Sequence, residues 1–303
     1  MLKNSHTKKF IKLTVNKMTY PEIVKKIKNL EIQGAENIAV KAVEAFAIKL
    51  KETQNKAKLT KYFEELKSLR ETEPGLRNAL KYCLENYEKN HKVAQYVIDH
   101  FKKSKEKIAE YGAKKIHNGM KVFTHCHSST VEAILIKAKK QGKNFTVYNT
   151  ETRPKFQGRI TATELAAQGI KVVHFVDSAG RSVMRKCDLF LFGCDALTSE
   201  GKVINKIGTE MLAECARDSR IPAYSCTNSW KFDPATLFGF DEEIEQRSAK
   251  EVWENPPKGV QIYNPAFEIV APDIFTGVIT ELGIYKPETL IVAVKEAYPW
   301  ITQ

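Results

Sequence analysis

The strongest constraint on the fold of this chain is a change of hydrophobic periodicity near residue 118. Between residues 21 and 118, apolar residues recur at three-to-four spacing, as in "PEIVKKIKNL" and "GAENIAVKAVEAFAIKLKE", which indicates amphipathic helices. After residue 118, short β-rich runs alternate with helical segments. We therefore predict a helical domain over residues 20–118 and an α/β domain over residues 119–303. Residues 1–19 show neither pattern, and we expect a disordered leader there.

The second part of the chain has the pattern of a parallel sheet. Its β-rich runs are "KVFTH", "FTVYNT", "KVVHFV", "DLFLFG" and "IPAYSC". Helical segments separate them, including "INKIGTEMLAECARDS", for which we predict a helix over residues 204–219. This alternation with short connections predicts a doubly wound, Rossmann-like α/β fold with helices on both faces of the sheet. A later run, "GVITELGIY", is expected to add a strand and "PETLIVAVKEAY" a final helix.

The excess of basic charge lies in the first part of the chain, in the predicted leader and helical domain. The net charge is +12, and residues 116–303 contain equal numbers of basic and acidic side chains, so the whole excess lies in residues 1–115. Two interpretations remain open, solvated lysines on helix surfaces and attraction to a polyanion or an acidic partner. No arginine-rich cluster with interleaved aromatic residues is present. We therefore do not expect nucleic-acid binding.

The cysteines and the apolar runs bear on the compartment. The six cysteines include no CxxC pair, which favours free thiols in a reducing environment over a disulfide framework or a zinc site. No run approaches the about 18 consecutive apolar residues of a membrane span. The start, "MLKNSHTKKFIKLTV", has no apolar signal-peptide core. We expect a cytoplasmic protein without a membrane partner or a bound metal.

The stretch "THCHSST", residues 124–130, lies where the first predicted strand passes into a helix. Open α/β sheets bind ligands at the carboxyl ends of their strands, and a helix amino terminus favours anions and lowers the pKa of a thiol. Cys126 is therefore a candidate base or nucleophile, the alternative being an inert buried thiol. His125 and His127 are interpreted as positioning or packing residues rather than metal ligands.

Two further strand ends carry candidate groups. Asp195 follows "LFLFG" closely, where burial could raise its pKa; the alternative is a helix cap or a loop carboxylate. "NKIGT" contains Asn205 and Lys206 and is a candidate phosphate cradle at a helix start, or only a capped helix. Arg153 and Arg159 flank a turn after the second strand. Together these groups favour a site for an anionic small molecule.

Several long motifs resemble one family. They are "THCHSST", "TETRPKFQGRITATELAAQGI", "GCDALTSEGKVINKIGT" and "NPAFEIVAPDIFTGVITELG". The family unites the alpha, beta and delta subunits of eukaryotic initiation factor 2B with methylthioribose-1-phosphate isomerase and archaeal ribose-1,5-bisphosphate isomerase. The context of "THCHS", "DSA" and "NPAF" is most similar to the last branch.

The resemblance implies an aldose–ketose isomerase that converts ribose 1,5-bisphosphate to ribulose 1,5-bisphosphate. It implies Cys126 and Asp195 as the catalytic pair, no cofactor, AMP as a possible activator, and a homo-oligomer, either a dimer or a trimer of dimers. The alternative is a non-catalytic regulatory subunit of the initiation factor type that binds a nucleotide or a sugar phosphate. The resemblance implies substrate contacts at Gln33, Gly34, Ala35, His127, Ser128, Ser129, Arg153, Asn205, Lys206 and Lys231.

The chain departs from the isomerase pattern at four positions. Gln33 and Glu73 each replace an arginine, Ser129 replaces a frequent lysine, and Glu36 replaces a small residue. We therefore expect a less cationic phosphate pocket than in the related isomerases. The candidates for compensation are Arg70, Arg77, Arg153 and Arg159.

Overall fold

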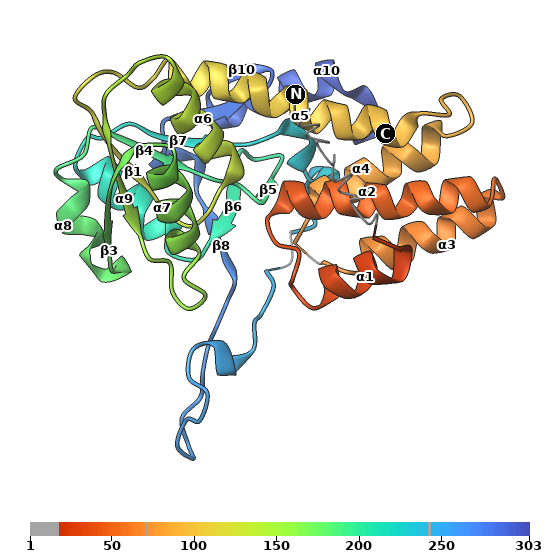
Figure 1. Ribbon diagram of the computed structural model, residues 1–303, viewed down its shortest axis with the longest axis horizontal. Helices are drawn as coiled ribbons and strands as arrows, with labels where there is room; N and C mark the ends of the chain where they lie inside the picture. Colours follow the sequence, from red (N-terminus) through yellow and green to blue (C-terminus); the bar gives the residue numbers. More distant parts are fainter. Residues whose placement is uncertain (1–17, 71, 242–243) are drawn as a thin grey trace, which may run out of the picture.

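The computed structural model describes residues 18–70, 72–241 and 244–303 (Figure 1). The predicted leader therefore lies outside the described residues, except for its last two. The helical pattern is confirmed by five successive helices: α1 (Tyr20–Lys28), α2 (Ala35–Glu52), α3 (Lys56–Lys67), α4 (Pro74–Asn86) and α5 (Val93–Ala113). In both α1 and α4, a proline stands in the first turn, where no intrahelical amide partner is needed.

The main sheet has seven strands in the order β10-β9-β7-β4-β1-β2-β3. They are β1 (Lys121–Thr124), β2 (Thr146–Thr150), β3 (Lys171–Phe175), β4 (Leu189–Phe192), β7 (Ala223–Cys226), β9 (Gly277–Thr280) and β10 (Gly283–Tyr285). All neighbours are parallel except β9 and β10, which form an antiparallel pair. The run predicted as one strand, residues 277–285, is thus two strands. The doubly wound α/β prediction is confirmed.

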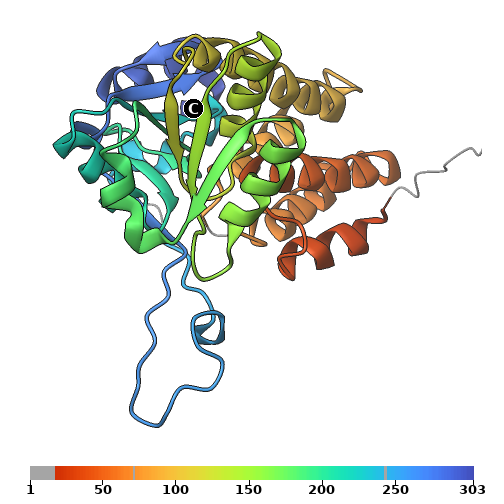
Figure 2. The ribbon, with the colours of Figure 1, turned by 60° about the vertical axis from the view of Figure 1, so that its left-hand side comes forward.

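Helices cover both faces of this sheet (Figures 1 and 2). They are α6 (Ser129–Lys140), α7 (Gln157–Ala167), α8 (Gly180–Met184), α9 (Thr209–Asp218) and α10 (Leu290–Ala297). Successive strand residues point to opposite faces. In β4, Leu189 and Leu191 therefore join the core beneath α5, α6 and α7, whereas Phe190 and Phe192 join the core that reaches α8, α9 and α10.

A second sheet corrects the helix predicted over residues 204–219. β6 (Val203–Lys206) lies between β5 (Ala196–Leu197) and β8 (Phe267–Val270), and both pairings are antiparallel. Helix α9 begins only at Thr209, after Gly208 with φ of 99°. Asn205 and Lys206 therefore lie on a strand and not at a helix start. Pairing with β8, some 60 positions later in the chain, overrides the local helical pattern.

Helix α5 joins the helical part to the sheet. Its first half contributes Val97 and Phe101 to a core that continues through α2 and α4, and its second half contributes Ile108 and Ala113 to the core on the sheet. A buried amide adds a polar link, because Asn78 Nδ2 on α4 donates to the carbonyl oxygens of Trp230 at 2.7 Å and Phe232 at 2.8 Å. The segment between these carbonyls carries Lys231.

In the part of the chain that the structure describes, no helix combines the length and the apolar character that crossing a membrane requires. Residues 244–266, between the 3₁₀ helix Pro234–Phe238 and β8, extend away from the body of the molecule (Figures 1 and 2). At the base of this extended segment, Glu245 and Arg247 line the cavity described below.

We expect Asn78→Ala to lower the free energy of unfolding by about 2 kcal/mol, because two buried hydrogen bonds are lost. Denaturant unfolding measures this change. Asn86→Ala is the control. Among the described residues, the Asn86 side-chain amide donates to the Tyr82 carbonyl of its own helix, so its loss should cost less than about 0.5 kcal/mol. Equal effects of the two substitutions would contradict a linking role for Asn78.

Candidate functional site

A cavity of about 500 Å³ lies between the helical part and the carboxyl ends of β1 and β4. The chain runs from β1 outward to β2 and β3, and then returns to place β4 on the other side of β1. The β1–β4 junction is therefore the topological switch point, where open α/β sheets bind ligands. The helical part closes the cavity with residues 33–38, Arg70 and Glu73.

Cys126 follows β1 in a left-handed backbone conformation, with φ of 65°. Two threonine hydroxyls hold this uncommon geometry: the Cys126 amide donates to Thr152 Oγ1 at 2.9 Å, and the Cys126 carbonyl accepts from Thr161 Oγ1 at 3.0 Å. A non-glycine residue in this region costs about 1 kcal/mol or more and commonly marks a functional site. The thiol is thus held at the cavity by neighbours in the loop after β2 and on α7.

The expected lowering of the thiol pKa is not observed. Burial raises the pKa of Cys126 to about 11, although the ammonium of Lys206 acts in the opposite direction. Cys126 precedes the helix start, because α6 begins at Ser129 and is capped by the Ser128 side chain. Desolvation outweighs the helix dipole at this position.

Two carboxyl groups share the interior of the cavity. Asp195 comes three residues after β4, and its amide donates to the Ile204 carbonyl at 2.8 Å. Burial raises the pKa of Asp195, and Lys231 and Lys206 oppose that shift. Glu73 is 2% exposed, and burial together with the charge of Asp195 raises its pKa to about 8. Among the described residues, Glu73 Oε2 has no hydrogen-bond partner.

The arginines of the cavity are already neutralised. Arg70 contacts Glu245 at 2.8 Å, and Arg247 contacts Glu245 at 2.8 Å and Glu251 at 2.9 Å. Within the described ranges, Lys206 and Lys231 line the cavity without a carboxylate partner within 4.0 Å. Lys206 lies 4.5 Å from the Phe267 ring centre, and Lys231 Nζ donates to the Cys194 carbonyl. These two ammonium groups are the available positive charges.

A glycine directly after β4 allows polar groups at the start of α6 and on β6 to lie close together. A Cβ added at Gly193 would lie 3.0 Å from Ser128 Cβ and 3.3 Å from Asn205 Oδ1. Asn205 Nδ2 donates to Thr209 Oγ1 at 2.9 Å, which fixes the orientation of the amide. The absence of a side chain at Gly193 therefore lets Ser128 and Asn205 line one wall.

Most of the predicted site residues line this cavity: Gln33, Gly34, Ala35, Cys126, His127, Ser128, Ser129, Asp195, Asn205, Lys206 and Lys231. Arg153 does not. Its side chain is exposed and lies over the Phe156 ring, with its guanidinium donating to the Val252 carbonyl at 3.3 Å. The Asp177 carboxylate accepts hydrogen bonds from the amides of Thr152 and Arg153, which directs this turn toward β3 and away from the switch point.

The other candidates for compensation have different partners. Arg159 pairs with Glu151 at 3.6 Å and Arg77 with Asp233 at 3.6 Å. Of the four candidate arginines, Arg70 lines the cavity, and it is already paired with Glu245. His125 uses both ring nitrogens: Nε2 donates to the Ile207 carbonyl at 2.9 Å, and Nδ1 lies 2.6 Å from Thr150 Oγ1. This arrangement agrees with a positioning role.

Sequence reasoning missed the charged group at the base of the extended segment. Glu245, Arg247 and Glu251 line the cavity but lie in a stretch without regular strand or helix periodicity. Glu245 meets Arg70 across 175 positions of sequence. The only local signal was the spacing of Arg247 and Glu251, which suits a pair one helical turn apart.

Iodoacetamide should label Cys126 before the other five cysteines, because Cys126 is half-buried whereas the other five are fully buried. The raised pKa should make this reaction slow at neutral pH. Peptide mapping by mass spectrometry measures the order of labelling, and an anionic ligand should protect the thiol. Simultaneous labelling of several cysteines under native conditions would contradict the geometry described.

Comparison with known proteins agrees with this architecture. The model of the initiation factor 2 subunit family matches residues 31–287. The ribose 1,5-bisphosphate isomerase of Thermococcus kodakarensis is 38% identical, with 92% of this chain and 94% of that protein covered. The structure of translation initiation factor eIF-2B from Pyrococcus horikoshii superposes with a TM-score of 0.80 at 28% identity, covering 90% of this chain and 98% of that chain.

A third similar protein is 5-methylthioribose 1-phosphate isomerase of Pyrococcus horikoshii. Its structure gives a TM-score of 0.74 at 25% identity, with 93% of this chain and 88% of that chain covered. The matches confirm the resemblance found in the motifs, and the isomerases among them confirm the expectation of an enzyme of that class. The chain belongs to the initiation factor 2 subunit family.

Proposed function

We propose that this chain is an aldose–ketose isomerase that converts ribose 1,5-bisphosphate to ribulose 1,5-bisphosphate. The observation that carries the proposal is that Cys126 and Asp195 line one cavity at the switch point. There the ammonium of Lys206 opposes the rise in pKa that burial causes in both groups. The volume of about 500 Å³ lies within the usual range for small-molecule sites. The names of the isomerase relatives support the substrate class.

The reaction moves one hydrogen from C2 to C1 and leaves the overall composition unchanged. The base is the Cys126 thiolate, which is the minor form at neutral pH because burial raises the pKa of the thiol. In the proposed first half, this thiolate removes the C2 proton, the C1–C2 double bond forms, and the bond from C1 to the ring oxygen breaks. Asp195 gives its proton to that oxygen. In the second half, the Cys126 thiol gives the proton to C1, and the C2 hydroxyl proton goes to Asp195 as the ketone forms. Both groups return to their starting states, as an acid–base pair requires, and no redox cofactor is needed.

We assign phosphate binding to the two ammonium groups of the cavity that pair with no carboxylate of the described residues. Lys206 and Lys231 supply charge, and Ser128 and Asn205 supply hydrogen-bonding groups in the same cavity. Glu73 stands where related isomerases have an arginine, but its pKa near 8 means that it is mostly uncharged at neutral pH. A protonated Glu73 can donate a hydrogen bond to a substrate oxygen. The departure at this position therefore does not exclude a bisphosphate.

We expect Cys126→Ser and Asp195→Asn each to lower turnover at least about a hundredfold, the low end of acid–base contributions. NMR of the purified protein with ribose 1,5-bisphosphate, with and without AMP, measures the conversion. Cys215→Ser on α9 and Asp218→Asn at its exposed end are matched controls outside the cavity and should retain activity.

The same assay separates the isomerase from a regulatory subunit. If the wild-type protein binds ribose 1,5-bisphosphate or a nucleotide without converting any ribose phosphate, the isomerase proposal is wrong and the cavity is a regulatory pocket. If it converts only ribose 1-phosphate or methylthioribose 1-phosphate, the reaction class stands and the assigned substrate is wrong.

Affinity for the bisphosphate should fall as the pH rises through about 8, because ionisation of Glu73 places a negative charge in the cavity. Below that pH the group is protonated in the folded protein, so the penalty is absent. At an effective dielectric near 20, the loss is about 1 kcal/mol or more, roughly a fivefold rise in Kd. Calorimetry between pH 6.5 and 9 measures it.

Glu73→Gln should abolish this pH dependence while leaving the affinity near pH 6.5 almost unchanged. The matched control is Glu31→Gln, since Glu31 lies at the exposed rim of the same cavity and should not alter the profile. An unchanged pH profile in Glu73→Gln would show that Glu73 does not face the bound phosphate.

A further inference from the structure

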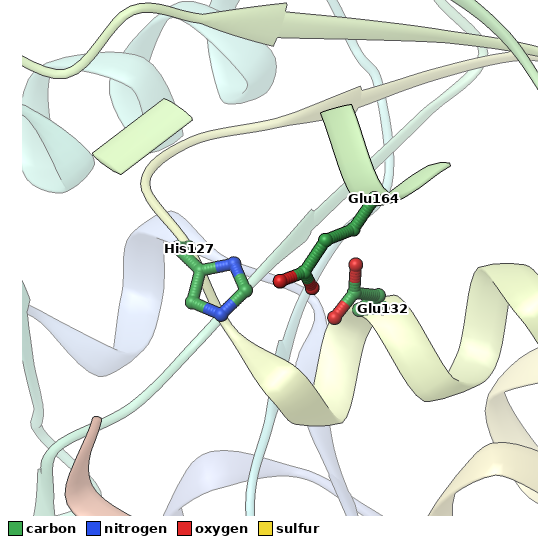
Figure 3. A group of neighbouring side chains, drawn as sticks. All are labelled: His127, Glu132 and Glu164. Carbon is green, nitrogen blue, oxygen red and sulfur yellow. The ribbon is translucent and has the colours of Figure 1, made fainter. Parts of the chain in front are cut away.

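A second group of ionisable side chains lies beside the cavity, on its α6–α7 side. It consists of His127 from the loop after β1, Glu132 from the first turn of α6 and Glu164 from α7. One ring nitrogen and one oxygen from each carboxylate lie within 4.8 Å of one another. Figure 3 shows both carboxylates turned toward each other, with the imidazole beside them. The proposed isomerisation uses neither glutamate.

Glu132 is the member of this group whose burial is least compensated by hydrogen bonds. It is only 8% exposed, and among the described residues its Oε1 atom has no hydrogen-bond partner. A buried carboxylate oxygen without a partner is costly, and a second carboxylate at close range adds repulsion. The pair must therefore share a proton or hold a cation between its oxygens.

The nearest lysine does not fill that place. Lys105 on α5 is close enough to influence Glu132 electrostatically, but its ammonium forms an ion pair with Glu36 at 2.7 Å. In the ranges that the structure describes, Lys105 makes no ion pair within 4.0 Å with Glu132 or Glu164. It therefore reduces the net negative charge around the group without satisfying the buried oxygen.

The imidazole supplies a ligand of another type. A neutral imidazole presents one nitrogen lone pair, and a ring nitrogen of His127 lies within 4.8 Å of an oxygen of each carboxylate. Its Nδ1 lies 3.1 Å from Thr161 Oγ1, whose hydroxyl donates to the Cys126 carbonyl. Metal-binding histidines are commonly oriented by such neighbouring hydrogen bonds.

We propose that His127, Glu132 and Glu164 bind a divalent cation that accepts mixed imidazole and carboxylate ligands, such as Mn²⁺. Three protein ligands leave further positions for water. The cation links the loop that carries Cys126 to both α6 and α7. His127 makes this link directly, and Thr161 of α7 adds to it by contacting His127 and donating to the Cys126 carbonyl. Its role is to hold that loop, and no step of the isomerisation passes through it.

The test uses the full chain, freed of metal by a chelator and titrated with Mn²⁺. The electron paramagnetic resonance signal of free Mn²⁺ measures binding, and calorimetry gives the stoichiometry. We expect one equivalent to bind, and the thermal midpoint to rise with Mn²⁺ concentration because only the folded chain contains the site. Mn²⁺ is the probe because hard cations prefer these ligands to the thiols of the chain.

Glu132→Gln and Glu164→Gln should each weaken Mn²⁺ binding at least about tenfold, the smaller effect known for groups that only support a ligand. Glu164 is exposed, so its variant decides the matter if Glu132→Gln folds poorly. Glu110→Gln is the matched control, because Glu110 is an exposed glutamate paired only with Lys137 in the described structure. Absence of saturable binding, or equal binding by all three variants, overturns the proposal and leaves the carboxyl pair sharing a proton.

Discussion

The contact between α5 and the sheet is the constraint on which the cavity depends. One helix contributes Phe101 to a core shared by the helical part and one face of the sheet, and Ile108 to the core on the other face, so the two parts cannot separate without exposing apolar surface. Burial of that surface is the dominant favourable term in folding. Because α5 fixes α2 and α4 over the ends of β1 and β4, residues from the first quarter of the chain close a site built mainly by the rest.

Closure of the cavity sets its electrostatics. Arg70 lines the cavity as an ion pair with Glu245, and Glu73 is buried there with a raised pKa. Burial raises the pKa of both Glu73 and Asp195, so the charge of the interior comes mainly from Lys206 and Lys231, which lie outside the basic first part of the chain. The positive charge of the chain is therefore no guide to the charge of its site. An anionic substrate is held by a few placed groups, as is usual for small-molecule pockets.

The backbone of the first loop links the two proposed sites. The Thr161 hydroxyl donates to the Cys126 carbonyl, and the Thr152 hydroxyl accepts from the Cys126 amide, so α7 and the loop after β2 jointly maintain the left-handed conformation of Cys126. His127, the next residue, lies beside Thr161 and the carboxylates of α6 and α7. A cation bound there and a substrate bound in the cavity would both contact the same short segment, Cys126 and His127.

The sequence by itself determined the two periodicities, the order of helices and strands, and the gathering of Cys126 and Asp195, because parallel strands bring their carboxyl ends to one edge. It did not determine the position of Arg153, which follows β2 but is turned away by Asp177. Nor did it determine that Asn205 and Lys206 lie on a strand, since the partner β8 is remote in sequence. The pKa values of Cys126 and Glu73 were also decided only by tertiary structure. Desolvation depends on which side chains surround a group in space, and local sequence pattern carries no record of those neighbours.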